Sequence, residues 1–135
     1  MRLACVAAFA LLATSLAPTE VSAALYACEV RDVKRVGADG VPVSDARTRE
    51  SLRLHPRFTF DDRTGRITGM AEDWVLSLLQ KAVGQNALLA VSIHKGIGNT
   101  GLQILKIDTF EKDAMPFVWV SDDVLATGVC TTGGD

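Results

Sequence analysis

The feature that most constrains the fold of this chain is a pair of cysteines near the two ends of the expected mature domain. Cys28 and Cys130 remain once the third cysteine, Cys5, is removed with an expected export signal. An even pair of cysteines in an exported chain is expected to form a disulfide. A disulfide requires Cα atoms within about 7 Å of each other, so the first and last elements must be neighbours. This requirement favours a closed or nearly closed sheet.

The N-terminal segment has the layout of a secretory signal peptide. Arg2 supplies a positive charge, residues 3–16 form an uncharged apolar run, and small residues permit cleavage after Ala23. The apolar run is shorter than the roughly 20 residues of a membrane span. We therefore expect residues 1–23 to be removed and residues 24–135 to form a single periplasmic or secreted β domain. A buried N-terminal helix or a retained anchor is the alternative.

A second targeting motif overlaps the start of the expected domain. Leu25-Tyr26-Ala27-Cys28 loosely resembles the lipid-attachment motif of bacterial lipoproteins. Tyrosine is a poor match at its position, the apolar run ends well before it, and lipidation would leave Cys130 unpaired. Lipoprotein anchoring at Cys28 is therefore a minor alternative.

Composition and charge narrow the classes of function. Hydrophobic residues make up 48% and charged residues 22% of the 135 residues, which is ordinary globular composition. The formal net charge is −2, so we expect no strongly basic face and no nucleic-acid binding. Since no second hydrophobic segment follows the signal, the mature domain is not expected to span a membrane. The two cysteines have no histidine or further cysteine at ligand spacing, so we expect no metal and no cofactor.

Alternating apolar and polar residues predict β-strands along most of the chain. The first strand lies around Tyr26–Val33. In Arg47–Asp61 the large apolar residues all fall on even numbers and every odd-numbered residue is polar, which predicts one half-buried strand. Asp61–Arg66 contains Gly65 and predicts a hairpin turn, after which Ile67 begins the return strand. Further strands are expected over residues 87–95, 102–110, 117–120 and 124–130.

Short strands separated by turns at regular spacing favour an all-β fold. We predict a small antiparallel barrel or sandwich of about seven to eight strands, with the first and last strands adjacent and disulfide-linked. Residues 71–83 are ambiguous, because their apolar residues repeat at helical spacing and Gly84 could end a helix. The same run also fits a strand buried on both faces, followed by a hairpin turn over 84–86. We favour the hairpin, and an α+β fold with a helix at 71–83 is the alternative.

Three short motifs stand at the start, in the middle and at the end of the expected domain. They are Tyr-Ala-Cys at 26–28, Phe-Asp-Asp-Arg-Thr-Gly at 60–65 and Gly-Val-Cys at 128–130. Together they resemble small exported bacterial β-barrel-like proteins of uncharacterised function. The resemblance covers most of residues 24–130 and implies an all-β domain. It also favours a strand over a helix at 74–83, and it implies no activity.

The Tyr-x-Cys start is similar to that of a second group, the small periplasmic β-barrels that inhibit C-type lysozymes. Their inhibitory loop carries a Ser-Gly-x-x-Tyr pattern. This chain lacks that pattern, because its only tyrosine is Tyr26. The more distant resemblance therefore implies a fold and a kind of function, but no inhibitory residues.

Four arginines are the best binding candidates in the chain. Arg47, Arg49, Arg53 and Arg57 all have odd numbers and would project from one face of the strand expected over 47–61. Guanidinium groups suit carboxylates, phosphates and anionic sugars. The simpler alternative, which we favour, is a solvated charged face that protects a strand edge from aggregation.

Other patterns do not assemble a catalytic set. Residues 96–101 spell G-x-G-x-x-G, but we expect a strand and not a helix to follow, so dinucleotide binding is not predicted. His55 and His94 have no nucleophile in a known arrangement. The carboxylate pairs at 61–62 and 122–123 fit turns better than acid–base couples. We therefore assign no catalytic residue.

The expected function is that of a non-catalytic exported protein that binds a protein partner or a small ligand. Two alternatives remain open. One is a small periplasmic hydrolase with a site around a histidine, and the other is a structural component of the cell envelope.

Overall fold

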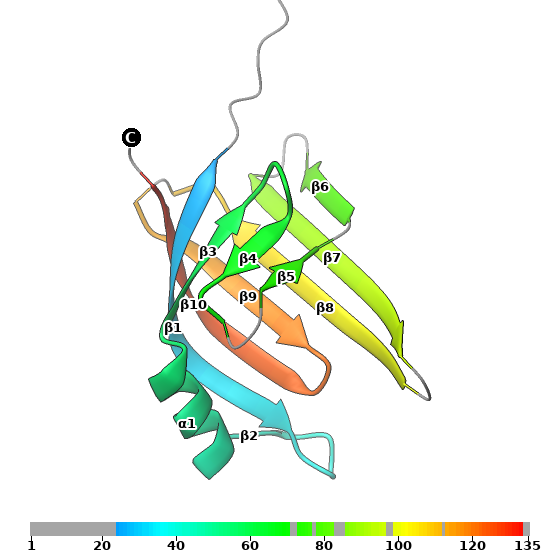
Figure 1. The fold of residues 1–135 in the computed structure, drawn as a ribbon. Coiled ribbons are helices and arrows are strands. Elements are labelled where there is room, and N and C mark those ends of the chain that lie inside the picture. The colour runs from blue at the N-terminus through cyan, green and yellow to red at the C-terminus, as the bar shows by residue number, and fades with distance from the viewer. Residues whose placement is uncertain are drawn as a thin grey trace, which may run out of the picture.

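The computed structural model describes residues 24–70, 73–76, 78–82, 86–96, 99–111 and 113–133, so the expected signal segment lies outside the described residues. Strands dominate this part of the chain, and it contains one short helix (Figure 1). The elements are β1 (Leu25–Val36), β2 (Pro42–Val43), α1 (Ala46–Leu54), β3 (Arg57–Asp61), β4 (Arg66–Thr68), β5 (Trp74–Val75), β6 (Leu78–Ala82), β7 (Ala87–Gly96), β8 (Asn99–Asp108), β9 (Met115–Ser121) and β10 (Val124–Thr132). Among the described residues, no helix has the length and apolar character needed to cross a membrane.

The strands form one antiparallel sheet that curls into a nearly closed barrel (Figure 1). Their order is β5-β4-β3-β1-β10-β9-β8-β7-β6, and β2 pairs with the end of β1. The strands at the two ends of this order, β5 and β6, follow each other in the chain. Counted as one interrupted strand, they complete a barrel of eight strands. The predicted small antiparallel barrel with adjacent first and last strands is therefore confirmed.

A disulfide joins the first strand of this barrel to the last. Cys28 on β1 and Cys130 on β10 are direct cross-strand partners, with Cα atoms 3.9 Å apart and a sequence separation of 102 residues. The predicted disulfide is thus confirmed, and it indicates an oxidising compartment outside the cytoplasm. The sulfur of Cys28 is already bonded in this structure, which argues against the lipoprotein alternative.

Inward-facing side chains fill the centre of the barrel. On β1 the residues from Tyr26 to Val30 alternate between buried and exposed, as predicted. The ring of Phe58 lies edge-on to those of Phe117 and Trp119, with centroids 5.1 and 5.4 Å away. Such contacts bury a large apolar area, so the centre of the barrel is a packed core.

Tight turns connect neighbouring strands where the sequence predicts them. Gly65, with a φ of +72°, supplies the left-handed residue of the β3–β4 hairpin. In the same turn the Asp61 carboxylate accepts the backbone N–H groups of Arg63 and Thr64 at 2.9 and 3.3 Å. The hydrogen bond from Arg63 is the main reason why the pKa of Asp61 is lowered. The hairpin turn predicted over Asp61–Arg66 is confirmed.

The single strand predicted over Arg47–Asp61 is wrong in its first half, because residues 46–54 form helix α1. Only Arg57–Asp61 is a strand, β3. A capping box begins the helix: Asp45 Oδ1 accepts the Thr48 N–H at 2.9 Å, and Thr48 Oγ1 accepts the Asp45 N–H at 2.9 Å. The local cap, together with good helix-forming residues, outweighs an alternation that rested on few apolar side chains.

Strands and not a helix occupy the described part of residues 71–83. β5 pairs with β4, and β6 pairs with β7 along all of its residues. The predicted hairpin is confirmed where the structure describes it, and the helix alternative is wrong there; residues 84 and 85 of the turn lie outside the described residues. Ladder hydrogen bonds to β4 and β7 satisfy the backbone of these strands, which outweighs the local helical spacing.

Part of the outer face of β7 to β10 is apolar as well. Val91, Ile104, Val120 and Leu125 form one row of consecutive cross-strand partners. Ile93, beside this row, is 65% exposed. Because β7 and β8 carry apolar side chains on both faces, their hydrophobic pattern does not distinguish the inside of the barrel from the outside.

Candidate functional site

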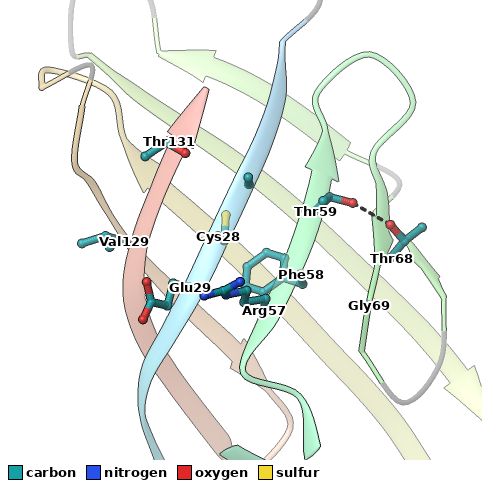
Figure 2. Close-up of a pocket in the computed structure, with 10 residues that line it drawn as sticks. Cys28, Glu29, Arg57, Phe58, Thr59, Thr68, Gly69, Val129 and Thr131 are labelled. Atoms are coloured by element: carbon teal, nitrogen blue, oxygen red, sulfur yellow. Dashed lines mark hydrogen bonds between the residues drawn. The ribbon is translucent and has the colours of Figure 1, made fainter. Parts of the chain in front are cut away.

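A groove with a volume of about 450 Å³ lies on the outer face of β10, β1, β3 and β4 (Figure 2). Its lining combines two opposite charges, three threonine hydroxyls and small apolar side chains. The residues that contribute these groups are Ala27, Glu29, Arg57, Thr59, Thr68, Val129 and Thr131. The volume is within the range of roughly 300–1,000 Å³ that is typical of small-molecule sites.

Glu29 and Arg57 are direct cross-strand partners on β1 and β3. Both are exposed, because their neighbours Cys28 and Phe58 point into the core and successive strand residues point to opposite faces. Neither charged group forms an ion pair or a side-chain hydrogen bond with another described residue. An anion can therefore reach the guanidinium group, and a cation the carboxylate, from the same groove.

The threonines add neutral hydrogen-bonding groups in the cross-strand row of Ala27, next to the row of this charge pair. Thr59 and Thr68 are cross-strand partners on β3 and β4, and their hydroxyl oxygens lie 2.6 Å apart (Figure 2). Thr131 contributes a third hydroxyl from β10. At Gly69, whose φ is +96°, a Cβ atom would lie only 3.0 Å from the carbonyl oxygen of Arg57. Glycine thus lets the chain after β4 approach β3 closely.

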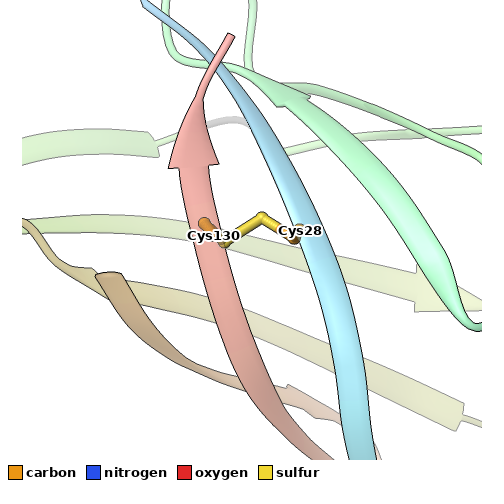
Figure 3. The surroundings of a disulfide bond; sticks show 2 residues. All are labelled: Cys28 and Cys130. Atoms are coloured by element: carbon orange, nitrogen blue, oxygen red, sulfur yellow. A yellow bond between two sulfur atoms is a disulfide. The ribbon is translucent and has the colours of Figure 1, made fainter. Parts of the chain in front are cut away.

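The disulfide connects two strands of the groove (Figure 3). Cys28 is flanked in the sequence by Ala27 and Glu29, and Cys130 by Val129 and Thr131, and all four flanking residues line the groove. Because the sulfur atoms link β1 covalently to β10, these flanking residues keep their relative positions. A site on covalently joined strands is more rigid than one on loops.

The other three candidate arginines lie on α1, away from this groove. Arg47 lines a smaller pocket of about 140 Å³, and Arg49 is exposed. The Arg53 guanidinium donates to the Glu50 carboxylate at 2.9 and 2.6 Å. The prediction that four arginines share one strand face is therefore wrong, because a helix turns successive residues by about 100°. Whether any of the four binds a ligand stays a prediction.

The largest pKa shift among the described residues is that of Asp45 at the start of α1, and it comes from contacts that hold the helix in place. The Arg35 guanidinium donates to the Asp45 carboxylate, and this hydrogen bond, together with that from the Thr48 N–H, lowers the pKa of Asp45 to about 2. The same pair raises the pKa of Arg35. Since Arg35 lies on β1, this ion pair connects the first turn of α1 to the barrel.

The histidines and the glycine-rich segment build no further site among the described residues. His55 follows α1, and its side chain forms no hydrogen bond with a described serine, cysteine or carboxylate. The side chain of His94 lies outside the described residues. The end of the glycine-rich segment already belongs to strand β8, so a strand and not a helix continues from it, as predicted; residues 97 and 98 lie outside the described residues. The described residues contain no cluster of three potential metal ligands. The hydrolase alternative stays a prediction.

Comparisons of this chain with protein-family models, with curated proteins and with solved structures find no match. The two resemblances drawn from short motifs therefore remain predictions at the level of the family. What the structure supports is their common architecture, a small and nearly closed antiparallel barrel whose first and last strands are joined by a disulfide.

Most of the groove residues are absent from the sequence-based candidates, which include only Arg57. The alternation on β1 places Glu29 on the outer face, so its exposure is readable from the sequence. Its position opposite Arg57 is not readable, because the pairing of β1 with β3 skips over β2 and α1.

Proposed function

We propose that this protein is a non-catalytic binding protein of the periplasm or extracellular space, and that the groove on β10, β1, β3 and β4 holds its ligand. One observation carries the proposal. Glu29 and Arg57 lie side by side in a groove of about 450 Å³, and neither is engaged in an ion pair with a described residue. The cleaved signal peptide predicted from the sequence agrees with this location.

The chemistry of the lining selects a small zwitterion. The guanidinium of Arg57 can bind a carboxylate through two parallel N–H donors, which is the strongest arrangement available to it. The carboxylate of Glu29 can accept an ammonium group. The hydroxyls of Thr59, Thr68 and Thr131 can donate to or accept from amide groups between the two ends. A free amino acid or a short peptide with both termini free presents these groups.

Nuclear magnetic resonance titration of the ¹⁵N-labelled protein tests this proposal. Trialanine with free termini, its N-acetyl derivative and its C-terminal amide are added to the oxidised protein. We expect saturable shifts at Glu29, Arg57 and Thr131 with the free peptide. Blocking either terminus should weaken binding about ten- to a hundredfold, because a hydrogen bond to a charged group contributes about 1.5–3 kcal/mol.

Matched variants separate the groove from general charge effects. Arg57→Gln should abolish the preference for a free carboxylate, and Glu29→Gln the preference for a free ammonium group. Arg49→Gln removes the same charge from the exposed face of α1 and should change neither preference. If all three peptides bind equally, or if none binds, the charge pair is a cross-strand contact of the sheet and the proposed function is wrong.

A further inference from the structure

The first residue after the predicted cleavage point is part of the folded barrel. Ala24 donates its backbone N–H to Asp62 Oδ1 at 2.9 Å, and its carbonyl oxygen accepts the Asp62 N–H at 3.2 Å. The Ala24 side chain packs against the buried core. These contacts continue the pairing of β1 with β3, in which Leu25 lies opposite Asp61. Ala24 is therefore held through its nitrogen, its oxygen and its methyl group.

Asp62 is unusually buried for a residue in a hairpin turn, because only 4% of its surface is exposed. Charged side chains are seldom buried unless a cation or hydrogen bonds compensate them. Burial raises the pKa of Tyr26, and the negative charge of Asp62 raises it further, so this charge acts on buried groups of β1. A positive charge next to Asp62 would lower the free energy of the folded state, since Coulomb attraction is strong where water is excluded.

We propose that cleavage after Ala23 supplies this positive charge, and that the new α-ammonium group of Ala24 forms an ion pair with Asp62. Hydrolysis of the peptide bond consumes one water molecule, leaves a carboxylate on Ala23 and leaves a primary amine on Ala24. An α-amino group has a pKa of about 7.7–8.0, so most of it is protonated at neutral pH. The nitrogen already lies 2.9 Å from Asp62 Oδ1, so the strand need not move.

Removal of the signal segment thus changes the stability of the barrel as well as the length of the chain. Before cleavage the Ala24 nitrogen is a neutral amide, which gives Asp62 a hydrogen bond without a charge. A hydrogen bond becomes stronger when its donor is ionised. The Cys28–Cys130 disulfide also belongs to the exported chain, because it forms in an oxidising compartment. Two of the contacts that fix β1 therefore arise only after export, and neither depends on the zwitterion groove.

The mature protein, recovered after export of the full precursor, provides the test. Mass spectrometry identifies its first residue, which we expect to be Ala24. Selective acetylation of the α-amino group then removes the charge and keeps an amide N–H on the same nitrogen. In urea titrations of the oxidised protein, acetylation should raise the equilibrium constant for unfolding about tenfold, the factor that a weak hydrogen bond between charged groups provides.

Asp62→Asn is the decisive variant, because it removes the negative charge and keeps an oxygen acceptor of the same shape. In this variant acetylation should change the equilibrium constant by less than about twofold. Asp39→Asn is the matched control. Asp39 also accepts a backbone N–H, from Val41 at 3.1 Å, but it lies in the turn after the other end of β1, so the full effect of acetylation should persist.

A second measurement needs no variant. The ¹³C signal of the Asp62 carboxylate should shift when the α-amino group is acetylated, and that of Asp39 should not. A first residue other than Ala24, an acetylation effect below about twofold in the unmodified protein, an equal effect in Asp62→Asn, or an unchanged Asp62 carboxylate signal would each overturn the proposal. None of these outcomes bears on the zwitterion groove.

Discussion

Reduction of the Cys28–Cys130 disulfide should lower the free energy of unfolding by several kcal/mol without changing the fold. The link closes a loop over 102 residues of sequence separation. The chain-entropy model assigns a loop of about 100 residues roughly 4.7 kcal/mol, and real proteins commonly show about 2–5 kcal/mol. The native state should change little, because the backbone pairing of β1 with β10 extends from Tyr26 to Arg35 and does not depend on the sulfur atoms.

The expected shift in melting temperature follows from the size of the domain. About 110 residues at roughly 2.1 cal/mol/K each have an unfolding entropy of about 0.23 kcal/mol/K. A loss of about 2–4.7 kcal/mol then lowers the melting temperature by about 10–20 °C. The denaturant dependence of the unfolding free energy should also become steeper, because an unfolded chain without the cross-link exposes more surface.

Guanidinium chloride titrations of the oxidised protein and of protein reduced during unfolding measure the free energy of unfolding and its denaturant dependence. A thiol count verifies the redox state of each sample. Both cysteines are at most 3% exposed, so reduction requires an unfolded or partly unfolded chain. The double variant Cys28→Ala/Cys130→Ala is the control, and its stability should not respond to reductant. A loss below about 1 kcal/mol on reduction would show that the unfolded chain gains little freedom, and would refute the loop-entropy reasoning.

Three further predictions concern a turn, a helix cap and the two faces of the sheet. Gly65→Ala should lower the free energy of unfolding by more than about 2 kcal/mol, because a Cβ there would lie 2.3 Å from a carbonyl oxygen. Gly40→Ala, also at positive φ but with open space around it, should lower it by about 1 kcal/mol. Equal losses would contradict the steric argument. Asp45→Ala should lower the melting temperature at neutral pH. The folded state lowers the pKa of Asp45 from its ordinary 3.8 to about 2, so its contribution is complete above the higher value and is lost as the pH falls through the lower one. Thermal melts of both proteins at a series of pH values should therefore converge in acid, and a constant difference would contradict this. In urea titrations, Ile107→Val inside the barrel should lower the free energy of unfolding by about 0.5–1.5 kcal/mol, and Ile93→Val on the outer face by less than about 0.5 kcal/mol. The reverse order would contradict the assignment of the two faces.

The features that the sequence predicts correctly depend on residues close together in the chain. Alternation along β1 identifies its inner and outer faces, and Gly65 marks the β3–β4 turn because few other residues adopt a positive φ. The capping box of Asp45 and Thr48 is equally local, and it marks the start of a helix where the alternation over 47–61 predicts a strand. The disulfide is a long-range feature, yet it is predictable because an exported chain with two cysteines has only one intramolecular pairing.

The tertiary structure decides which strands become neighbours, and that in turn decides the candidate sites. Residues 74–82 are compatible with a helix until pairing with β4 and β7 supplies their hydrogen bonds. Glu29 meets Arg57, and Ala24 meets Asp62, only because distant segments align in a particular register. Local sequence patterns predict which side chains of a segment share a face and where turns and helix caps lie. The choice among possible pairings depends on the total burial and hydrogen bonding of the closed barrel, a sum over the whole chain that no short stretch of sequence contains.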